Sequence, residues 1–186
     1  MKITRLLSVL ALTVAAATAN AASVSLVPGA LTVDEGANFD IDLVLDATDT
    51  LVPGFSGSMS GVVVIEYDPS LVSFSGFAYN SPASANEPLM MANLSGVEVV
   101  GIDFTNAATA GAIGTYSFTA VAPSGSVIDI AISASMSAGF ANESPTNKPF
   151  FPDFENTAVS VVPIPASAWL MMSAIGFTAG FLRRRT

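Results

Sequence analysis

Hydrophobic and polar residues alternate along the segment NFDIDLVLD, from Asn38 to Asp46. Positions 39, 41, 43 and 45 are all apolar, whereas Asp40, Asp42 and Asp46 occupy the positions between and after them. A period of two, with one apolar and one polar face, predicts a β-strand that is buried on one side.

The same kind of pattern continues along the middle of the chain. Alternating or β-branched runs predict strands at residues 24–27, 31–33, 61–67, 71–77, 97–104, 113–121, 126–133 and 157–162. Turn-forming pairs such as Pro28-Gly29 and Asp68-Pro69 separate these runs. About nine strands at short, regular spacing predict an all-β protein folded as a two-layer sandwich.

This sandwich is expected to be a single domain over residues 23–138. Residues 139–162 form a tail rich in Pro and Phe that ends in the last predicted strand. Residues 85–93 (ANEPLMMAN) predict a short helix or a loop that covers the sandwich.

The N-terminal residues 1–21 have the composition of a secretory signal peptide. Lys2 and Arg5 precede an apolar run over residues 6–17, and small residues follow at Ala19 and Ala21. A basic start, a short apolar core and a small-x-small site predict cleavage by signal peptidase after Ala21 or one residue later. A retained membrane anchor is the alternative.

The C-terminal region predicts one transmembrane helix. Residues 166–182 carry no charge, and a helix of that length spans about 26 Å. Arg183, Arg184 and Arg185 follow directly and are expected to stay in the cytoplasm, while Trp169 lies near the opposite interface. The acidic middle of the chain is then outside the cytoplasm, which agrees with the signal peptide.

The residues before this helix resemble a known sorting signal. Val162, Pro163, Ile164, Pro165, Ala166, Ser167, Ala168 and Trp169, followed by the apolar stretch and the arginines, resemble the PEP-CTERM class, in its VPLPA variant. The resemblance assigns residues 163–186 to a signal that a membrane-embedded exosortase reads and cuts. The two prolines prevent a helix and leave an extended segment at the membrane. The alternative is a simple single-pass anchor with a Pro-rich stalk.

Charge and composition exclude several classes of function. The chain has 15 acidic and 6 basic residues and no His or Cys. Between residues 22 and 162 the only cation is Lys148, so this part carries a net charge of −14. Such a surface repels nucleic acids. Without His or Cys, a Ser-His-Asp triad and thiolate or imidazole metal sites are absent, and we expect no enzyme activity.

A second resemblance concerns the sandwich itself. Val33-x2-Gly36-x2-Phe39-x-Ile41-x-Leu43, then Tyr67-Asp68-Pro69-Ser70-Leu71-Val72-x-Phe74, then Gly111-x-Ile113-x-Thr115-x-Ser117-Phe118, are similar to the cohesin domain and related carbohydrate-binding-module-like sandwiches. The resemblance implies a nine-stranded jelly roll that binds other molecules; cohesins bind dockerin modules. Residues 47–60 form an extra stretch rich in Gly, Ser and Asp, and no dockerin-contact residues are assigned.

Two groups of residues are candidates for ligand binding. Asp40 and Asp42 project from one strand face and are candidates for binding calcium, which prefers oxygen ligands; a solvated acidic face is the alternative. Phe150, Phe151 and Phe154 form an aromatic cluster that could bind a glycan or pack the last segment onto the sandwich. No catalytic residues and no other cofactor are expected.

Together these features predict a non-catalytic, exported bacterial protein. It is expected in the inner membrane and periplasm before processing by exosortase, and at the cell surface or in the extracellular matrix afterwards. Its sandwich is expected to contact an envelope protein or an exopolysaccharide. The alternatives are a carbohydrate-binding module and a calcium-stabilised, adhesin-like domain.

Overall fold

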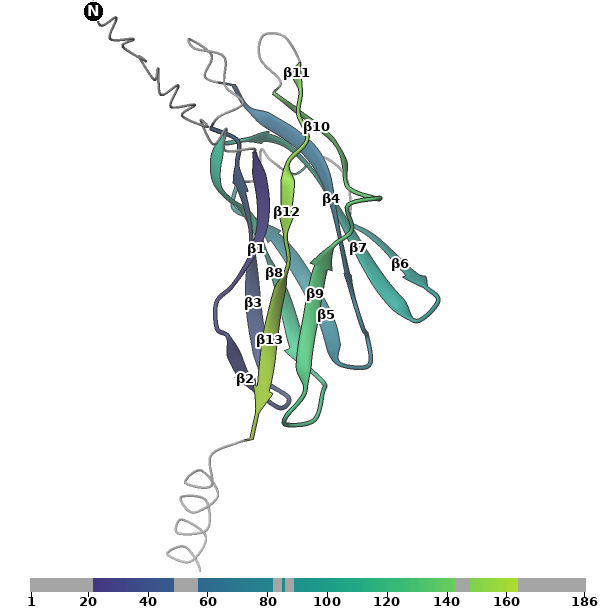
Figure 1. Cartoon of the computed structure of the whole chain (residues 1–186). Coiled ribbons are helices and arrows are strands. Elements are labelled where there is room, and N and C mark those ends of the chain that lie inside the picture. The colour runs from purple at the N-terminus through teal and green to yellow at the C-terminus, as the bar shows by residue number, and fades with distance from the viewer. Residues whose placement is uncertain (1–21, 49–56, 82–84, 86–88, 143–147, 164–186) are drawn as a thin grey trace, which may run out of the picture.

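The structure, a computed structural model, describes residues 22–48, 57–81, 85, 89–142 and 148–163, and over these residues it is a sandwich of two β-sheets (Figure 1). The five-stranded sheet has the order β12-β1-β3-β8-β5. Its strands are β12 (Asp153–Glu155), β1 (Ser23–Pro28), β3 (Asn38–Asp46), β8 (Ala110–Ala120) and β5 (Val72–Tyr79). The prediction of an all-β sandwich is confirmed.

The eight-stranded sheet is built around β4 (Met59–Tyr67), which pairs along one edge with β7 (Val97–Ala107). β6 (Met90–Leu94) adds to β7. The other edge of β4 pairs with β10 (Ala138–Asn142) and then with β9 (Val127–Ile132). β11 (Lys148–Pro149), β13 (Thr157–Val162) and β2 (Thr32–Asp34) complete this sheet.

The alternation that predicts β3 also explains why β3 lies where it does. Phe39, Ile41, Leu43 and Leu45 are buried between the sheets, while the aspartates of the same strand face solvent. β4 is more uniformly apolar because it is a central strand with neighbours on both edges.

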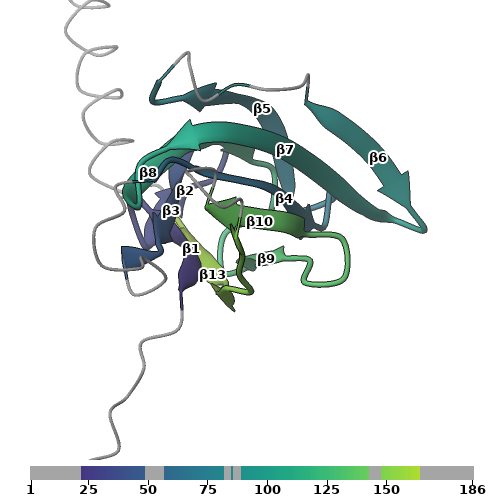
Figure 2. The ribbon, with the colours of Figure 1, turned by 90° about the horizontal axis from the view of Figure 1, so that it is seen from above.

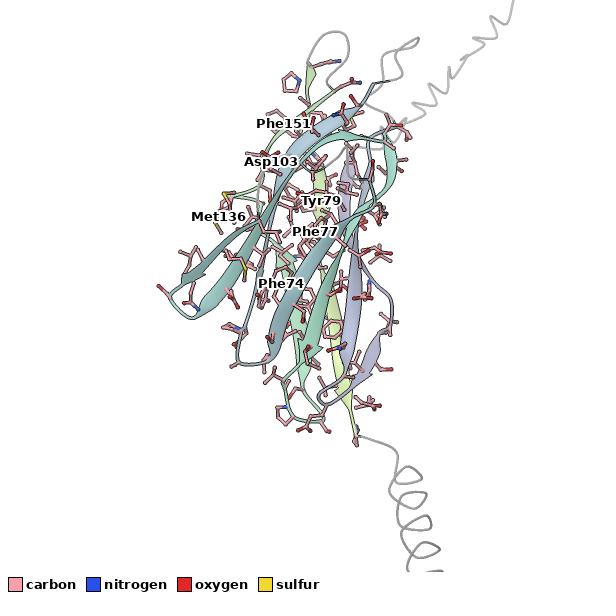
Figure 3. All side chains as sticks on the ribbon, turned by 180° about the vertical axis from the view of Figure 1, so that it is seen from behind. Phe74, Phe77, Tyr79, Asp103, Met136 and Phe151 are labelled. Carbon is pink, nitrogen blue, oxygen red and sulfur yellow. The ribbon has the colours of Figure 1, made fainter. Side chains whose placement is uncertain are left out.

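Aromatic rings fill the centre of the sandwich. The Phe118 ring is fully buried, and its centroid lies 5.5–5.6 Å from those of Phe39, Tyr67 and Phe74. Towards β5, the Tyr79 hydroxyl donates a 2.8 Å hydrogen bond to the backbone carbonyl of Asp103 and so joins the two sheets (Figure 3).

The first and last strands run side by side. β1 pairs in parallel with β12 in one sheet, and β2 pairs in parallel with β13 in the other. The first and the last part of the described chain therefore pass side by side from the five-stranded sheet to the eight-stranded sheet. The start of β1 and the end of β13 lie at opposite ends of the sandwich (Figure 1).

Two details of the predicted fold differ from the structure. Residues 85–93 were expected to form a helix or a loop, but Met90–Leu94 is a strand, β6, that forms a hairpin with β7. The described residues contain thirteen strands rather than about nine. The four additional strands are β6, β10, β11 and β12; β12 arises because the last part of the chain changes sheet between β12 and β13.

Within the described ranges, no helix is long and apolar enough to cross a membrane. The predicted helix over residues 166–182 and the signal peptide over residues 1–21 both lie outside these ranges.

Candidate functional site

The outer face of the eight-stranded sheet carries an apolar surface at the β6–β7 hairpin. Inward-facing Val100, Ile102 and Phe104 of β7 belong to the core. The alternate residues Val97 and Val99 face outwards, so the first half of β7 carries apolar residues on both faces. A strand with this pattern is expected to have a cover on each side, yet Val97 is 39% exposed.

A tight turn brings β6 back along β7. Ser95 and Gly96 form the two-residue loop, and both have positive φ, 56° and 95°. Positive φ at both positions is the geometry of a type I′ turn, whose twist matches that of the strands. The Asn93 side chain accepts a 3.2 Å hydrogen bond from the Gly96 amide and fixes the turn.

The side chain of Met90 lies across the outer face of β7. Its Cε is 3.2 Å from the place where a Cβ on Gly101 would lie, and Val64 of β4 is next to the same place. The absence of a side chain at residue 101 therefore lets Met90 reach towards β4. Met90 itself remains 57% exposed.

Next to this hairpin lies a groove of about 490 Å³, which we call the hairpin groove. Leu94, Val97, Val99 and Met136 provide its apolar lining. Glu66, Asp68 and Asp129 also line it and are acidic. The groove therefore combines an apolar floor with negatively charged sides.

The loop that carries Met136 is held by the backbone of β4. Val64 lies between the part of β4 that pairs with β10 and the part that pairs with β9. Its amide donates to Ser137 Oγ at 3.0 Å, and its carbonyl accepts from the Ser133 amide at 2.8 Å. These bonds position the loop so that Met136 lies on the outer face (Figure 3).

Charges at the groove are set by local hydrogen bonds and burial. The Ser70 hydroxyl and amide donate to the Asp68 carboxylate at 2.6 and 2.8 Å, and both bonds lower the pKa of Asp68. Burial, together with the neighbouring Glu98 carboxylate, raises the pKa of Tyr67. At neutral pH Asp68 is therefore ionised and Tyr67 is neutral.

The sequence patterns did not single out this groove. Met90 and Leu94 lie in or beside a segment that is expected to be a helix or a loop. Without a predicted strand, the sequence does not indicate which of their side chains lie on the outer face of a sheet. The signal that could have found the hairpin is the Ser-Gly pair at residues 95–96 between two apolar runs.

The predicted aromatic cluster divides into packed and exposed members. Phe150 and Phe154 pack on Phe140, with centroid distances of 5.8 and 5.9 Å. Phe151 is 90% exposed and lines a second cavity of about 440 Å³ together with these rings. Figure 3 shows Phe151 at the end of the sandwich near β10 and β11.

The calcium candidates lie on the outer face of the five-stranded sheet. Asp40 accepts a 2.7 Å hydrogen bond from Ser117 Oγ, and Asp42 accepts a 2.6 Å hydrogen bond from Thr115 Oγ1. No group of three or more His, Cys, Asp or Glu suited to a metal occurs among the described residues. Calcium binding stays a prediction.

Of the predicted processing residues, two are described. Val162 is the last residue of β13, and Pro163 follows it outside the sheet. The others lie outside the described residues: Ala19, Ala21, Pro165, Ala166, Ser167, Trp169, Arg183, Arg184 and Arg185.

Comparisons with known proteins show where this architecture recurs. No protein-family model matches the chain, and no curated protein matches it. Solved structures of cohesins do match, over about three quarters of this chain and nearly all of theirs.

One is the cohesin of OlpC from Clostridium thermocellum in complex with a dockerin, with a TM-score of 0.57 and 13% identity over 77% of this chain and 95% of that one. The sixth cohesin of scaffoldin B from Acetivibrio cellulolyticus, also in a dockerin complex, has a TM-score of 0.53 and 17% identity over 76% and 99%. The cohesin module of a Clostridium perfringens family 33 glycoside hydrolase has a TM-score of 0.51 and 10% identity over 77% and 97%. The sandwich of this chain has the cohesin fold.

Proposed function

We propose that this chain is a non-catalytic, exported module that binds a partner protein at the hairpin groove. The observation that carries the proposal is the uncovered apolar lining of the groove, where Leu94 and Val97 are 49% and 39% exposed beside three carboxylates. Contiguous apolar surface with a polar rim is typical of protein-binding sites. Two of the similar cohesins were solved bound to dockerins, which supports a role in protein recognition.

Site-specific photo-crosslinking in the host bacterium tests this proposal. A benzophenone side chain in place of Leu94 in the full chain is expected to give one dominant protein adduct. The same group in place of Val121, which is 53% exposed and outside the groove, is the control. No adduct from residue 94, or the same adducts from both positions, would contradict the proposal.

We further propose that both ends of the chain are processed. Signal peptidase would cut after Ala21, and an exosortase would cut near the motif that begins at Val162 and Pro163. The protein would then pass from the inner membrane to the cell surface or the extracellular matrix. Support comes from β13 ending at Val162, because the motif then begins where backbone pairing stops.

Mass spectrometry of the cell-associated and released protein tests the processing. The expected product begins at or near Ala22 and lacks Arg183, Arg184 and Arg185. A mature chain that is intact through Thr186 would contradict sorting by cleavage.

A second candidate function is binding of an exopolysaccharide at Phe151. One observation favours it: this ring is 90% exposed at a cavity lined by three other phenylalanines. Flat apolar rings can stack on sugar faces. A glycan array with the full chain and with Phe151→Ala tests it; equal binding by both, or none, would contradict this function.

A further inference from the structure

β6 is an unusual free edge of the sandwich. Within the described residues, the five-stranded sheet ends at β12 and β5, and the eight-stranded sheet has free edges at β2, β11 and β6. A free edge presents unpaired backbone groups, which natural proteins protect by short strands, charges, prolines or bulges. Figure 2 shows β6 at the outer margin of the molecule.

The other four edges each carry such protection. β2, β11 and β12 have three, two and three residues, and they contain Asp34, Lys148 with Pro149, and Asp153 with Glu155 respectively. β5 has a register shift between Phe74 and Gly76.

β6 has none of these features. It pairs with β7 without a register shift, and residues 89–97 contain no charge and no proline. All five residues of β6 are exposed, Met90 and Met91 to 57% and 53%. An edge that is regular, apolar and unprotected is suited to accept another strand.

The register indicates which backbone groups would receive that strand. In a hairpin with a two-residue loop, the pair that flanks the loop, Leu94 with Val97, exchanges hydrogen bonds, and pairs then alternate. Ala92 and Met90 therefore bond to β7. Met91 and Asn93 direct their N–H and C=O groups to the free edge.

We propose that an extended segment of a partner protein adds as a strand to the free edge of β6, with apolar side chains against Met90 and Leu94 and basic side chains towards the acidic residues nearby. This inference rests on the proposed function and names how the partner is held: by backbone bonds to the edge, with the hairpin groove beside it.

Charge complementarity favours a basic partner over a second copy of this chain. Glu66, Asp68 and Asp129 line the groove, and Glu98 pairs with Asn93 of β6. The one cation among the described residues is Lys148, on β11. Two copies of a sandwich with net charge −14 repel each other, whereas Lys or Arg on the partner is attracted.

The test compares two substitutions at residue 91 in the full chain, each carrying the crosslinker at residue 94. Met91→Pro removes an outward N–H without removing a ladder bond to β7, because proline is tolerated on the free side of an edge strand. Met91→Thr removes the same side chain but keeps that N–H. Strand addition predicts that Met91→Pro lowers adduct yield about tenfold while Met91→Thr stays within about twofold.

Three results would overturn the inference. Adduct that persists in Met91→Pro, but disappears in the groove variant Val97→Asp, means that the partner docks on the face alone, and the proposed function survives. If the chain that carries the crosslinker at residue 94 and no other substitution gives no adduct, both the proposed function and this inference are wrong. A dimer in sedimentation velocity that Met91→Pro dissociates means that the strand comes from a second copy.

A second variant guards against misfolding. Met91→Lys keeps the backbone of β6 intact and places a positive charge on the edge, where it repels a basic partner. It is expected to lower adduct yield as Met91→Pro does. Circular dichroism melting of each variant verifies that the sandwich is intact, and a folded Met91→Lys chain with unchanged adduct yield also contradicts the inference.

Discussion

Phe118 illustrates how one side chain contributes to both layers. Its ring contacts Phe39 and Phe74 within the five-stranded sheet and Tyr67 from the eight-stranded sheet. Removing a buried aromatic ring loses transfer free energy and leaves a cavity that packed neighbours fill only partly. The position is therefore more sensitive than its hydrophobicity alone indicates.

We predict that Phe118→Ala lowers the free energy of unfolding by about 3–5 kcal/mol. Phe151→Ala is the matched control, since this ring is 90% exposed and its loss is expected to change stability by less than about 0.5 kcal/mol. Urea unfolding followed by circular dichroism measures both. Similar losses for the two variants would mean that Phe151 is packed in solution.

All three tyrosines of the chain share one electrostatic property. Burial is the main cause that raises the pKa of Tyr67, Tyr79 and Tyr116 above the usual value for a tyrosine. A raised folded-state pKa means that the unfolded chain loses the phenolic protons first. The contribution of these pKa shifts to the free energy of unfolding is therefore fully present below about pH 10 and is lost as the pH rises above that value.

The corresponding prediction is alkaline unfolding coupled to tyrosine ionisation. Tyrosinate absorbance is expected to rise cooperatively above about pH 10, together with loss of the β-sheet circular dichroism signal. A gradual titration near the ordinary pKa, with the signal of the sheets unchanged, would show that at least one of these hydroxyls is accessible to solvent.

At the scale of elements, the hairpin β6–β7 depends on its turn. Gly96 has a φ of 95°, a region that side-chain-bearing residues rarely adopt. A β-branched residue there is costly, whereas Ser95 at φ 56° lies where asparagine is tolerated.

We predict that Gly96→Val destabilises the chain by about 1–2 kcal/mol and lowers crosslinking from residue 94, because β6 loses its alignment with β7. Ser95→Asn is the matched control and is expected to leave both unchanged, since Asn-Gly favours the same turn. Hydrogen exchange of the β6 amides reports the local effect directly. Equal protection in the two variants would rule out this dependence.

Periodicity recovered the elements whose environment is uniform along their length. β3 and β13 were predicted residue for residue, because each has neighbours on both edges and one buried face. β6 was missed because its exposure on both faces leaves no period to detect. β11 and β12 were missed because strands of two or three residues are defined by their partners rather than by their own sequence.

The candidate site was less predictable, because its residues are brought together by packing and strand pairing between distant parts of the sequence. Phe150, Phe151 and Phe154 were noticed as a cluster, but only the structure separates the exposed ring from the two that pack on Phe140. Leu94 and Asp129 line the same groove although they are 35 positions apart in the sequence. Their proximity follows from sheet pairing, because β6 pairs with β7, β7 pairs with β4, and β4 pairs with β9.

At the scale of the whole molecule, the start of β1 and the end of β13 lie at opposite ends of the sandwich, and a C-terminal membrane anchor would therefore set the distance of the groove from the membrane. If residues 166–182 span the bilayer as the sequence predicts, the three residues 163–165 would form a tether that allows a separation of at most about 10 Å between the sandwich and the membrane. Through Tyr67, Ile130 and Thr157, which pair in register, the groove lies about five strand residues, or roughly 17 Å, above the end of β13.

The hairpin groove would thus stand roughly 25 Å above the lipid surface, a clearance close to the diameter of a small folded domain. Large partners would be excluded sterically while the tether is intact, and cutting the tether would remove that limit. Processing near Pro163 and Pro165 would then change more than the location of the protein. It would also determine when the groove becomes accessible to a partner the size of a domain.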